Sequence, residues 1–426
     1  MGCVTSKQVE DDRIVEPDLR PAHGSNTAET TRARRLSYSI EAKARQQQLR
    51  QPPAFAVVSE DDKGADGTTD NKGGSATARG RRLSYVTNDK NLADKIKAEY
   101  AMYAEDDSSP QQQPATAAAA AAAAAGGSPK PQPQQAKKQR PIDVQVVCMS
   151  RAGREPGYKK TNQDNCFAFE KYITEEQAMF GAMDGHGPHG HLVSGFVKQH
   201  LPILLVQHLT SGLSLKEALS TGFLDVDAGL AGSNVDCEFS GSTCSLAHLK
   251  GTTLTTAWVG DSRMVLGRQG KRGSWEAVDV SHDHKPTLPE EKSRILKQQG
   301  RVERLVDEMG QPMGPYRVWL QYAWIPGLAM SRALGDQLAH TVGVSSEPQH
   351  VQLELTPADK LLILASDGVW EFISSKEAVE LVGGCATPEE GCRLLVDEAH
   401  QRWLHEEEGV VDDITAVVVR LVHTRQ

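Results

Sequence analysis

The sequence has no paired-cysteine spacing, no long apolar run and few aromatic residues. Its seven cysteines include no CxxC pair, so their spacing predicts neither a zinc site nor a disulfide framework and favours a reducing compartment. No apolar run approaches the roughly 20 residues of a transmembrane helix. The opening MGCVTSKQVEDDR lacks the apolar region of a secretory signal. These absences predict a protein that is neither secreted nor embedded in a membrane through a helix.

Charge and composition narrow the class of protein further. The formal charge is -9 at pH 7, and 38% of the 426 residues are hydrophobic. A protein that binds nucleic acid needs a basic surface against the phosphates, and an acidic chain does not offer one. We therefore expect a soluble protein with an acidic surface and no nucleic-acid partner.

The first 140 residues differ from the rest in composition. They are rich in Gln, Ala, Ser, Pro and Gly, and they contain an unbroken alanine run from Ala117 to Ala125. Such a segment buries too little apolar surface to offset the loss of chain entropy on folding. Residues 1–140 are therefore predicted to form a disordered tail, within which residues 91–104 have the pattern of a short amphipathic helix.

From Pro141 onward the pattern becomes that of a folded domain. Apolar, β-branched runs predict strands at 141–153, 179–185, 242–249, 253–261, 263–268, 361–368 and 414–422. Turns as short as LKGT and GDS between such strands require antiparallel neighbours. Helices are predicted at 191–209, 214–226, 288–299, 374–382 and 387–404.

The start of the last predicted helix is especially well marked. Thr387 is placed as its N-cap, Pro388 as its first residue and Glu390 as the acid of a capping box. Short antiparallel strands mixed with long helices predict an α+β domain of packed sheets covered by helices, and we place it at residues 141–424.

Four apolar segments of this domain lead into aspartate. They are FGAMDG, WVGDSR, LILASDG and VVDDIT, which contain Asp184, Asp261, Asp367, Asp412 and Asp413. A carboxylate at the end of a buried strand is rigidly held, and its charge is costly unless a cation neutralises it. Oxygen ligands without nearby Cys or an HExxH motif favour Mg²⁺ or Mn²⁺ over zinc. Each motif alone also fits an ordinary turn, but four together predict a metal cluster.

Eight motifs follow one another along the domain. They are TNQDNCF, FGAMDGHGPHG, SGSTCSLAHL, WVGDSRMVL, DHKPTLPEEKSRI, LAMSRALGDQ, LLILASDGVWEFIS and DDITAVVVRL. This series resembles the metal-dependent serine/threonine protein phosphatase family, type 2C, and the resemblance extends over the whole predicted domain. It implies an α+β fold in which a central sandwich of two antiparallel β-sheets is flanked by α-helices. It also implies two Mg²⁺ or Mn²⁺ ions at one end of the sandwich.

The resemblance assigns roles to the acidic residues. It implies that Asp184 bridges both ions, that Gly185 gives its carbonyl oxygen to one of them, and that Asp367 and Asp412 complete the protein ligands. Asp164 is implied to act through metal-bound water. The stretch DGHG, which by itself fits a turn, is then a ligand loop.

Further roles follow from the same resemblance. Asp261 corresponds to a residue linked to a weaker third ion. His186 corresponds to the histidine that protonates the leaving alcohol, a step worth about 10²–10⁴-fold in rate. Lys159 or Lys160 takes the place of an arginine that holds phosphate in some relatives, and the sequence does not decide between these two lysines.

Some positions depart from the family pattern or lie outside its motifs. Asp413 stands where Asn is usual and Glu371 where Asp is usual, so both change the charge or geometry near the ions without removing a ligand. Residues 301–327 take the place of a variable flap, whose aromatic side chains either shape substrate choice or close a small core. His189 and His191 are interpreted as loop and helix-start residues.

These features predict a protein phosphatase that hydrolyses phosphoserine and phosphothreonine in protein substrates with a metal-activated water. One alternative is a catalytically weak phosphatase-like scaffold or phosphopeptide-binding protein at a membrane. Another is a different metal hydrolase, such as a nuclease. The complete aspartate set argues against the first alternative, and the acidic net charge argues against the second.

The tail carries signals for lipid attachment and for phosphorylation. MGCVTS fits the N-myristoylation pattern at Gly2, and Cys3 is placed for palmitoylation. Two acyl chains are predicted to hold the protein at a cytoplasmic membrane face. The motif RRLSY occurs around both Ser37 and Ser84, with the arginine spacing that basophilic kinases favour. Phosphate there is expected to weaken the attraction of the arginines to anionic lipid.

Overall fold

The structure is a computed structural model, and it describes residues 84–85, 94–96, 98, 141–156, 160–307, 309–407 and 409–424. The predicted disordered tail therefore lies outside the described residues, except for two short pieces at Ser84 and Ile96. Four predicted sites also lie outside them: Gly2, Cys3, Ser37 and Lys159.

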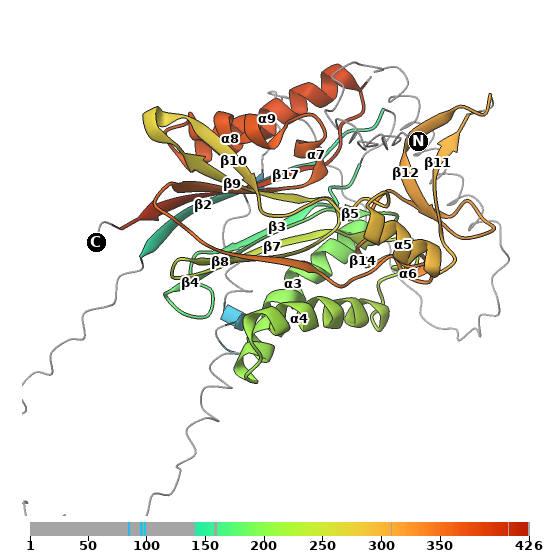
Figure 1. Cartoon of the computed structure of the whole chain (residues 1–426), viewed down its shortest axis with the longest axis horizontal. Helices are drawn as coiled ribbons and strands as arrows, with labels where there is room; N and C mark the ends of the chain where they lie inside the picture. The colour runs from blue at the N-terminus through green and yellow to red at the C-terminus, as the bar shows by residue number, and fades with distance from the viewer. Residues whose placement is uncertain are drawn as a thin grey trace, which may run out of the picture.

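Two antiparallel sheets form the centre of the domain (Figure 1). The larger sheet has the strand order β1-β2-β17-β16-β9-β10, with bounds Ser84–Tyr85, Ile142–Arg151, Ile414–His423, Asp359–Ala365, Arg263–Gln269 and Trp275–Asp279. The smaller has the order β15-β8-β7-β4-β3, with bounds Gln349–Glu354, Thr253–Val259, Cys244–Lys250, Gln177–Met183 and Asn165–Phe169. Cys148, Trp258 and Val417 are among the buried side chains that pack between the sheets. The predicted sandwich is confirmed.

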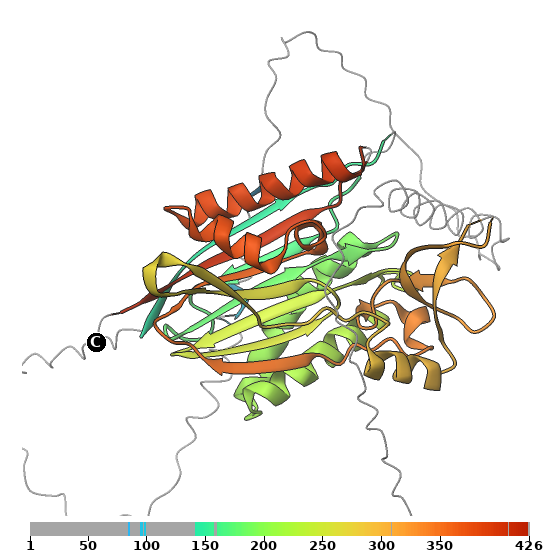
Figure 2. The same cartoon turned by 45° about the horizontal axis from the view of Figure 1, so that its top comes forward.

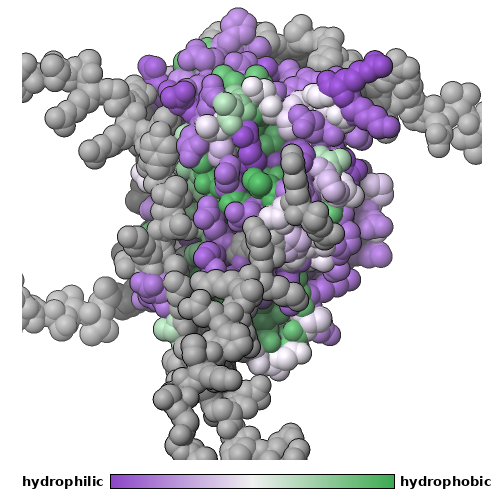
Figure 3. Space-filling view, turned by 90° about the vertical axis from the view of Figure 1, so that its left-hand side faces the viewer, coloured by the Kyte–Doolittle hydropathy of each residue, from purple (hydrophilic) through white to green (hydrophobic). Residues whose placement is uncertain are grey.

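Helices cover the outer faces of both sheets, as the red and green helices of Figure 2 show. α3 (Gly190–Thr210) and α4 (Leu215–Ala231) pack on the smaller sheet. α7 (Asp367–Trp370), α8 (Ser375–Gly383) and α9 (Pro388–Glu406) pack on the larger one. Figure 3 views the domain from one end, where apolar patches lie among polar residues. The five predicted helices correspond to α3, α4, α5 (Pro289–Lys297), α8 and α9.

The starts of these helices follow their local sequence. Ser214 and Glu217 form a complete capping box at α4. At α9, Thr387 Oγ1 accepts the backbone N–H of Glu390 at 3.2 Å, as predicted. The Glu390 carboxylate, however, accepts from the N–H of Ala386 at 3.1 Å. In a capping box this carboxylate would accept the N–H of the N-cap residue Thr387. Here it accepts the N–H of the preceding residue instead.

The two short turns of the sequence behave differently. LKGT joins β7 and β8 in an antiparallel hairpin, as predicted. The GDS turn does not, because β9 pairs with β10 and β16 in the other sheet. Gly260, with a φ of 92°, lies where the chain changes sheets. The prediction of a second hairpin is wrong, and Asp261 instead lies at the crossing between the two sheets.

The flap is a small sheet of β11 (Arg301–Val306), β12 (Pro312–Trp319) and β13 (Pro326–Leu328), near α5 (Pro289–Lys297) and α6 (Gln337–His340). Trp319 is buried, and its ring centroid lies 5.0 Å from that of Trp324. Tyr322 is 92% exposed, and Tyr316 is also exposed. The buried Trp319 fits the interpretation that flap aromatics close a small core, whereas a role of the exposed tyrosines in substrate choice stays a prediction.

Two predicted absences concern cysteines and membrane spans. The six cysteines in the described part of the chain are free thiols, five of them buried. No helix within that part combines the length and apolarity needed to cross a bilayer.

Candidate active site

The predicted acidic residues meet at one end of the sandwich. Asp184 follows β4, and Asp261 follows β8 after Gly260. Asp367 follows β16 after Ser366 and is the first residue of α7. Asp164 directly precedes β3, and Asp412 lies just before β17. β4 pairs with β3 and β16 with β17, both antiparallel. The end of one strand therefore lies beside the start of its partner, which brings these carboxylates together.

Burial and mutual repulsion raise the pKa of the central carboxyl groups. Burial, followed by the charges of Asp164 and Asp367, holds the pKa of Asp184 well above its ordinary value. Burial and then Asp412 do the same for the pKa of Asp367. Burial and Asp413 raise the pKa of Asp164 to about 7. Such a cluster is unfavourable unless positive charge enters it.

Two lysines supply positive charge to the cluster. Lys285 Nζ lies 2.5 Å from Asp261 Oδ2. Burial opposes ionisation of Asp261, but Lys285 outweighs burial and lowers the pKa of that carboxyl group. Lys160 Nζ contacts Asp412 Oδ1 and lies 3.5 Å from Asp413 Oδ2. Of the two lysines considered for phosphate binding, Lys160 therefore faces the acid pair.

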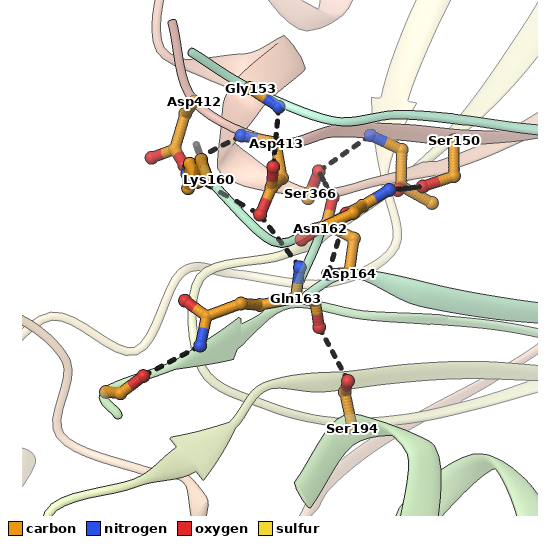
Figure 4. A network of polar contacts seen from close by, with 12 residues as sticks. Ser150, Gly153, Lys160, Asn162, Gln163, Asp164, Ser194, Ser366, Asp412 and Asp413 are labelled. Atoms are coloured by element: carbon orange, nitrogen blue, oxygen red, sulfur yellow. Dashed lines mark hydrogen bonds and ion pairs between the residues drawn. The ribbon is translucent and has the colours of Figure 1, made fainter. Parts of the chain in front are cut away.

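Asp413 is buried and fastens the segment that carries Asp164 (Figure 4). Its Oδ1 accepts the backbone N–H of Gly153 at 2.6 Å, and its Oδ2 accepts that of Gln163 at 2.9 Å. A carboxylate can accept both hydrogen bonds, whereas an amide offers only one acceptor oxygen. The acid at this unusual position therefore has a structural task.

A second set of hydrogen bonds holds Asp164 itself (Figure 4). Ser366 Oγ donates to Asp164 Oδ2 at 2.8 Å, and Asn162 Oδ1 accepts the backbone N–H of Asp164 at 3.0 Å. The Asn162 side chain also donates to Ser150 Oγ, and Thr415 Oγ1 donates to the same Ser150 oxygen, both at 2.8 Å. The network ties together β2, β17 and the segment before β3.

Close backbone contacts account for two glycines of the DGHG stretch. Gly185 lies in β5 (Gly185–His186), where a Cβ would be 2.3 Å from the carbonyl oxygen of Gly190 and 2.5 Å from that of Gln163. Gly187 has a φ of 82°, and a Cβ there would lie 2.1 Å from the carbonyl oxygen of Phe239. Packing alone therefore requires both glycines.

His186 has a partner that the sequence did not predict. Its Nε2 lies 2.6 Å from Oδ2 of Asp336. Like Asp261, Asp336 directly follows a glycine near the end of a strand, here β14 (Leu334–Gly335). This Gly-Asp pattern within SRALGDQ is the sequence signal that could have identified Asp336 as a site residue. β14 and β5 flank β6 (Gly241–Ser242) in a second three-stranded sheet, separate from the flap. His189 and His191 lie at the start of α3, as predicted.

The donor atoms suit hard cations. Oδ1 of Asp164, Oδ1 of Asp261 and Oδ1 of Asp367 are buried without a hydrogen-bond partner among the described residues. No three Asp, Glu, His or Cys side chains of that part converge into a ready metal cage. Carboxylate oxygens nevertheless favour Mg²⁺ or Mn²⁺. Cations would relieve both the mutual repulsion and the unpartnered oxygens, so the residues fit them.

The domain is similar to known proteins in sequence and in fold. Residues 149–406 match the family model described as Protein phosphatase 2C. The Arabidopsis thaliana protein named Probable protein phosphatase 2C 73 is 34% identical over 298 residues, which are 63% of this chain and 77% of that protein. The Oryza sativa subsp. japonica protein named Probable protein phosphatase 2C 64 is 38% identical over 258 residues, or 58% and 60% of the two chains.

A solved structure supports the fold. The crystal structure of serine-threonine phosphatase 2C from Toxoplasma gondii has a TM-score of 0.57 at 22% sequence identity. The match covers 67% of this chain and 96% of that chain. The sandwich described above is therefore shared with a solved phosphatase 2C.

Proposed function

The chain belongs to the protein phosphatase 2C family, whose members are protein serine/threonine phosphatases, and from this premise we propose that it hydrolyses phosphoserine and phosphothreonine with two Mg²⁺ or Mn²⁺ ions. The observation that supports the metal dependence is the group of aspartates at one end of the sandwich. Burial and the neighbouring carboxylates raise the pKa values of Asp164, Asp184 and Asp367. Among the described residues, Oδ1 of Asp164, of Asp261 and of Asp367 is buried without a hydrogen-bond partner.

Asp184, the carbonyl oxygen of Gly185, Asp367 and Asp412 would hold the two ions, and Asp261 would hold a weaker third. When bound, the ions supply a water of lowered pKa as nucleophile and neutralise the phosphate. Asp164, held in place by Ser366, orients the attacking water. The reaction needs no phosphorylated enzyme side chain.

His186 is the proposed general acid. A seryl or threonyl oxygen leaves poorly as an alkoxide, so a proton from the imidazolium helps the phosphorus–oxygen bond to break. The Asp336 carboxylate lies 2.6 Å from Nε2 and holds the imidazole ring in place. Asp336 is therefore a positioning residue for the same step.

Substrate binding is assigned to the flap and to one of the two lysines. Because Lys160 faces Asp412 and Asp413, we assign it to the charge balance of the acid pair and assign phosphate binding to Lys159. The exposed Tyr316 and Tyr322 of the flap offer aromatic surface to the peptide around the phosphoresidue.

Turnover of a phosphopeptide and of p-nitrophenyl phosphate tests this proposal, first with added Mn²⁺ and then with chelator. We expect activity that depends on the metal and that is lost in Asp184→Asn and in Asp367→Asn. Asp225→Asn is a matched control, because Asp225 is exposed on α4 and pairs with His208 rather than with the acid cluster. A folded chain that is inactive with every metal but still binds the phosphopeptide would instead be a phosphatase-like scaffold.

We also propose that myristoyl Gly2 and palmitoyl Cys3 attach the protein to a cytoplasmic membrane face, with Ser37 and Ser84 phosphorylated by basophilic kinases. The support is the MGCVTS opening and the repeated RRLSY motif. Fractionation of wild type, Gly2→Ala, Cys3→Ser and a double Ser37→Asp/Ser84→Asp variant tests the parts separately. Full membrane binding of Gly2→Ala contradicts the anchor, and an unshifted double variant contradicts the phosphorylation switch.

A further inference from the structure

A short strand from the tail lies on the edge of the larger sheet. β1, which consists of Ser84 and Tyr85, pairs antiparallel with β2, so that Ser84 is opposite Ser150 and Tyr85 is opposite Met149. In the strand order, β1 is the outermost strand and β2 follows it. Without β1, β2 would present unpaired backbone N–H and C=O groups along its edge. Addition of an extended segment to such an edge is a common mode of peptide recognition.

A second contact of the tail follows along the chain. Ile96 is 1% exposed and belongs to the core cluster between the smaller sheet and α3, which includes Phe169, Tyr172 and Val197. Its neighbours Asp94 and Lys95 are exposed, so Ile96 alone of these three residues points into the core. In Figure 1 this piece lies, in blue, beside α4.

The two contacts can be made at the same time. Ile96 lies eleven positions after Tyr85, and a chain of that length spans up to about 36 Å when extended. Packed sheets lie about 10 Å apart. The chain is therefore long enough to run from the edge of the larger sheet past the smaller sheet to α3.

The structure points to an interaction surface for a named segment of this chain, and we propose that Ser84 and Tyr85 of the second RRLSY motif dock on the edge of β2 and are held there through Ile96, which shields Ser84 from kinases. This inference does not depend on the catalytic activity of the domain. It predicts different phosphorylation rates at Ser37 and Ser84, although both serines lie in the same motif, RRLSY.

The shielding follows from backbone geometry. A kinase transfers the terminal phosphoryl group of ATP to the serine oxygen, forming an oxygen–phosphorus bond, releasing ADP and sending the hydroxyl proton to solvent. The serine and its flanking residues must lie in the kinase cleft for this step. Backbone paired with β2 cannot occupy that cleft, so phosphorylation of Ser84 must wait until β1 leaves the sheet, and its rate tracks the undocked population.

The docking position also adjoins the active site. Ser150, opposite Ser84, accepts the hydrogen bonds from Asn162 and Thr415 that brace the segment carrying Asp164. Undocking of β1 therefore exposes the edge of β2 at the residue where this network begins.

The test measures initial rates of modification at Ser37 and Ser84 in the full chain. A purified basophilic serine kinase and the thiophosphoryl analogue of ATP are used, because thiophosphate resists removal by a phosphatase, and both sites are quantified by mass spectrometry. We expect Ser84 to react at least about fivefold more slowly than Ser37 in the wild type. In Ile96→Asp the two rates should become about equal.

Lys95→Gln is the matched control, because it changes the charge by the same amount at an exposed neighbouring position and should keep the wild-type ratio. Ile96→Ala gives a smaller shift in the same direction if Ile96→Asp fails to fold. Hydrogen exchange of the amides near Met149 and Ser150 should quicken in both Ile96 variants. Equal rates at the two serines in the wild type, or a ratio that no Ile96 variant changes, would overturn the proposal.

Discussion

Nε2 of His186 lies 2.6 Å from Oδ2 of Asp336, a residue 150 positions further along the chain. Asp336 has a φ of 45°, a left-handed conformation that costs a non-glycine residue about 1–2 kcal/mol. A Cβ on Gly241 would lie 2.1 Å from the same Asp336 oxygen. The contact thus depends on a strained backbone at Asp336 and on the absence of a side chain at Gly241. Such strain argues that the pair has a functional role.

Asp336→Asn should slow hydrolysis of a phosphopeptide by roughly tenfold or more, because the imidazolium of His186 loses its carboxylate partner. p-Nitrophenyl phosphate should be affected much less, since its leaving group needs no proton. kcat and KM on the two substrates check this, with His186→Ala as the reference. Because the two residues act in one step, the double variant should lose no more than His186→Ala. Equal losses on both substrates would remove the acid–base role.

Gly241→Ala should reproduce the loss seen in Asp336→Asn, because the added Cβ would lie 2.1 Å from Asp336 Oδ2 and 2.7 Å from His186 Nε2. Gly195→Ala is the control, because a Cβ there meets nothing within 4 Å. That control should keep full activity and gain up to about 1 kcal/mol in the free energy of unfolding, since Gly195 is helical. Wild-type turnover in Gly241→Ala would show that the contact is dispensable.

Lys160→Met should destabilise the domain in the presence of chelator, because Asp412 and Asp413 then repel each other without the Lys160 ammonium. Asp413→Asn removes one of these charges, so the two changes should be non-additive by about 1 kcal/mol in a double-mutant cycle. Urea unfolding measures this coupling, and Lys160→Arg serves as the charge-preserving control. A raised KM with unchanged stability in Lys160→Met would instead identify Lys160 as the phosphate-binding lysine.

The free energy of unfolding should depend on pH through His284. Burial, followed by the charge of Arg332, lowers the pKa of His284 to about 4, and its Nδ1 accepts the N–H of Gly260 at 3.1 Å. An unfolded histidine titrates near 6.5, so between these values the unfolded state binds more protons and the folded state loses stability as pH falls. The loss is about 2 kcal/mol at pH 5.

His284→Asn isolates this contribution, because it keeps an acceptor for the Gly260 N–H and removes the titrating ring. Urea unfolding at pH 7 and pH 5 should show the wild type losing about 2 kcal/mol more than the variant. A difference between the two proteins that stays constant across this pH range would contradict the assignment.

Local pattern predicted most of the fold because the apolar runs are long and their ends are marked. β16 and β17 are nearly continuous aliphatic segments. Because such segments are buried, the sequence predicts that the neighbouring Asp367 and Asp412 lie at the strand ends. Antiparallel pairing then brings Asp367 and Asp412 together, although no short-range pattern links them. Strand ends alone therefore predicted Asp184, Asp261, Asp367 and Asp412, whereas Asp164 was predicted only through the family resemblance.

Contacts set by tertiary packing could not be predicted in this way. The GDS turn is as short as a hairpin turn, yet Gly260 directs β9 into the other sheet. The pairing of His186 with Asp336 and that of Lys160 with Asp412 depend on where separate loops meet. Ile96 lies in the stretch predicted as a short amphipathic helix, but the sequence does not show that the core beside α3 buries it.

The pairing of β2 with β17 determines when during synthesis the domain can be completed. β2 is the first strand of residues 141–424 and β17 the last, and they pair from Ile142 opposite His423 to Arg151 opposite Ile414. Because β17 lies between β2 and β16, the larger sheet has a gap at its centre until the ribosome has made these last residues. Contacts between such distant segments form slowly and late. A nascent chain thus cannot assemble its carboxylates, and it gains catalytic competence only when the final strand is inserted.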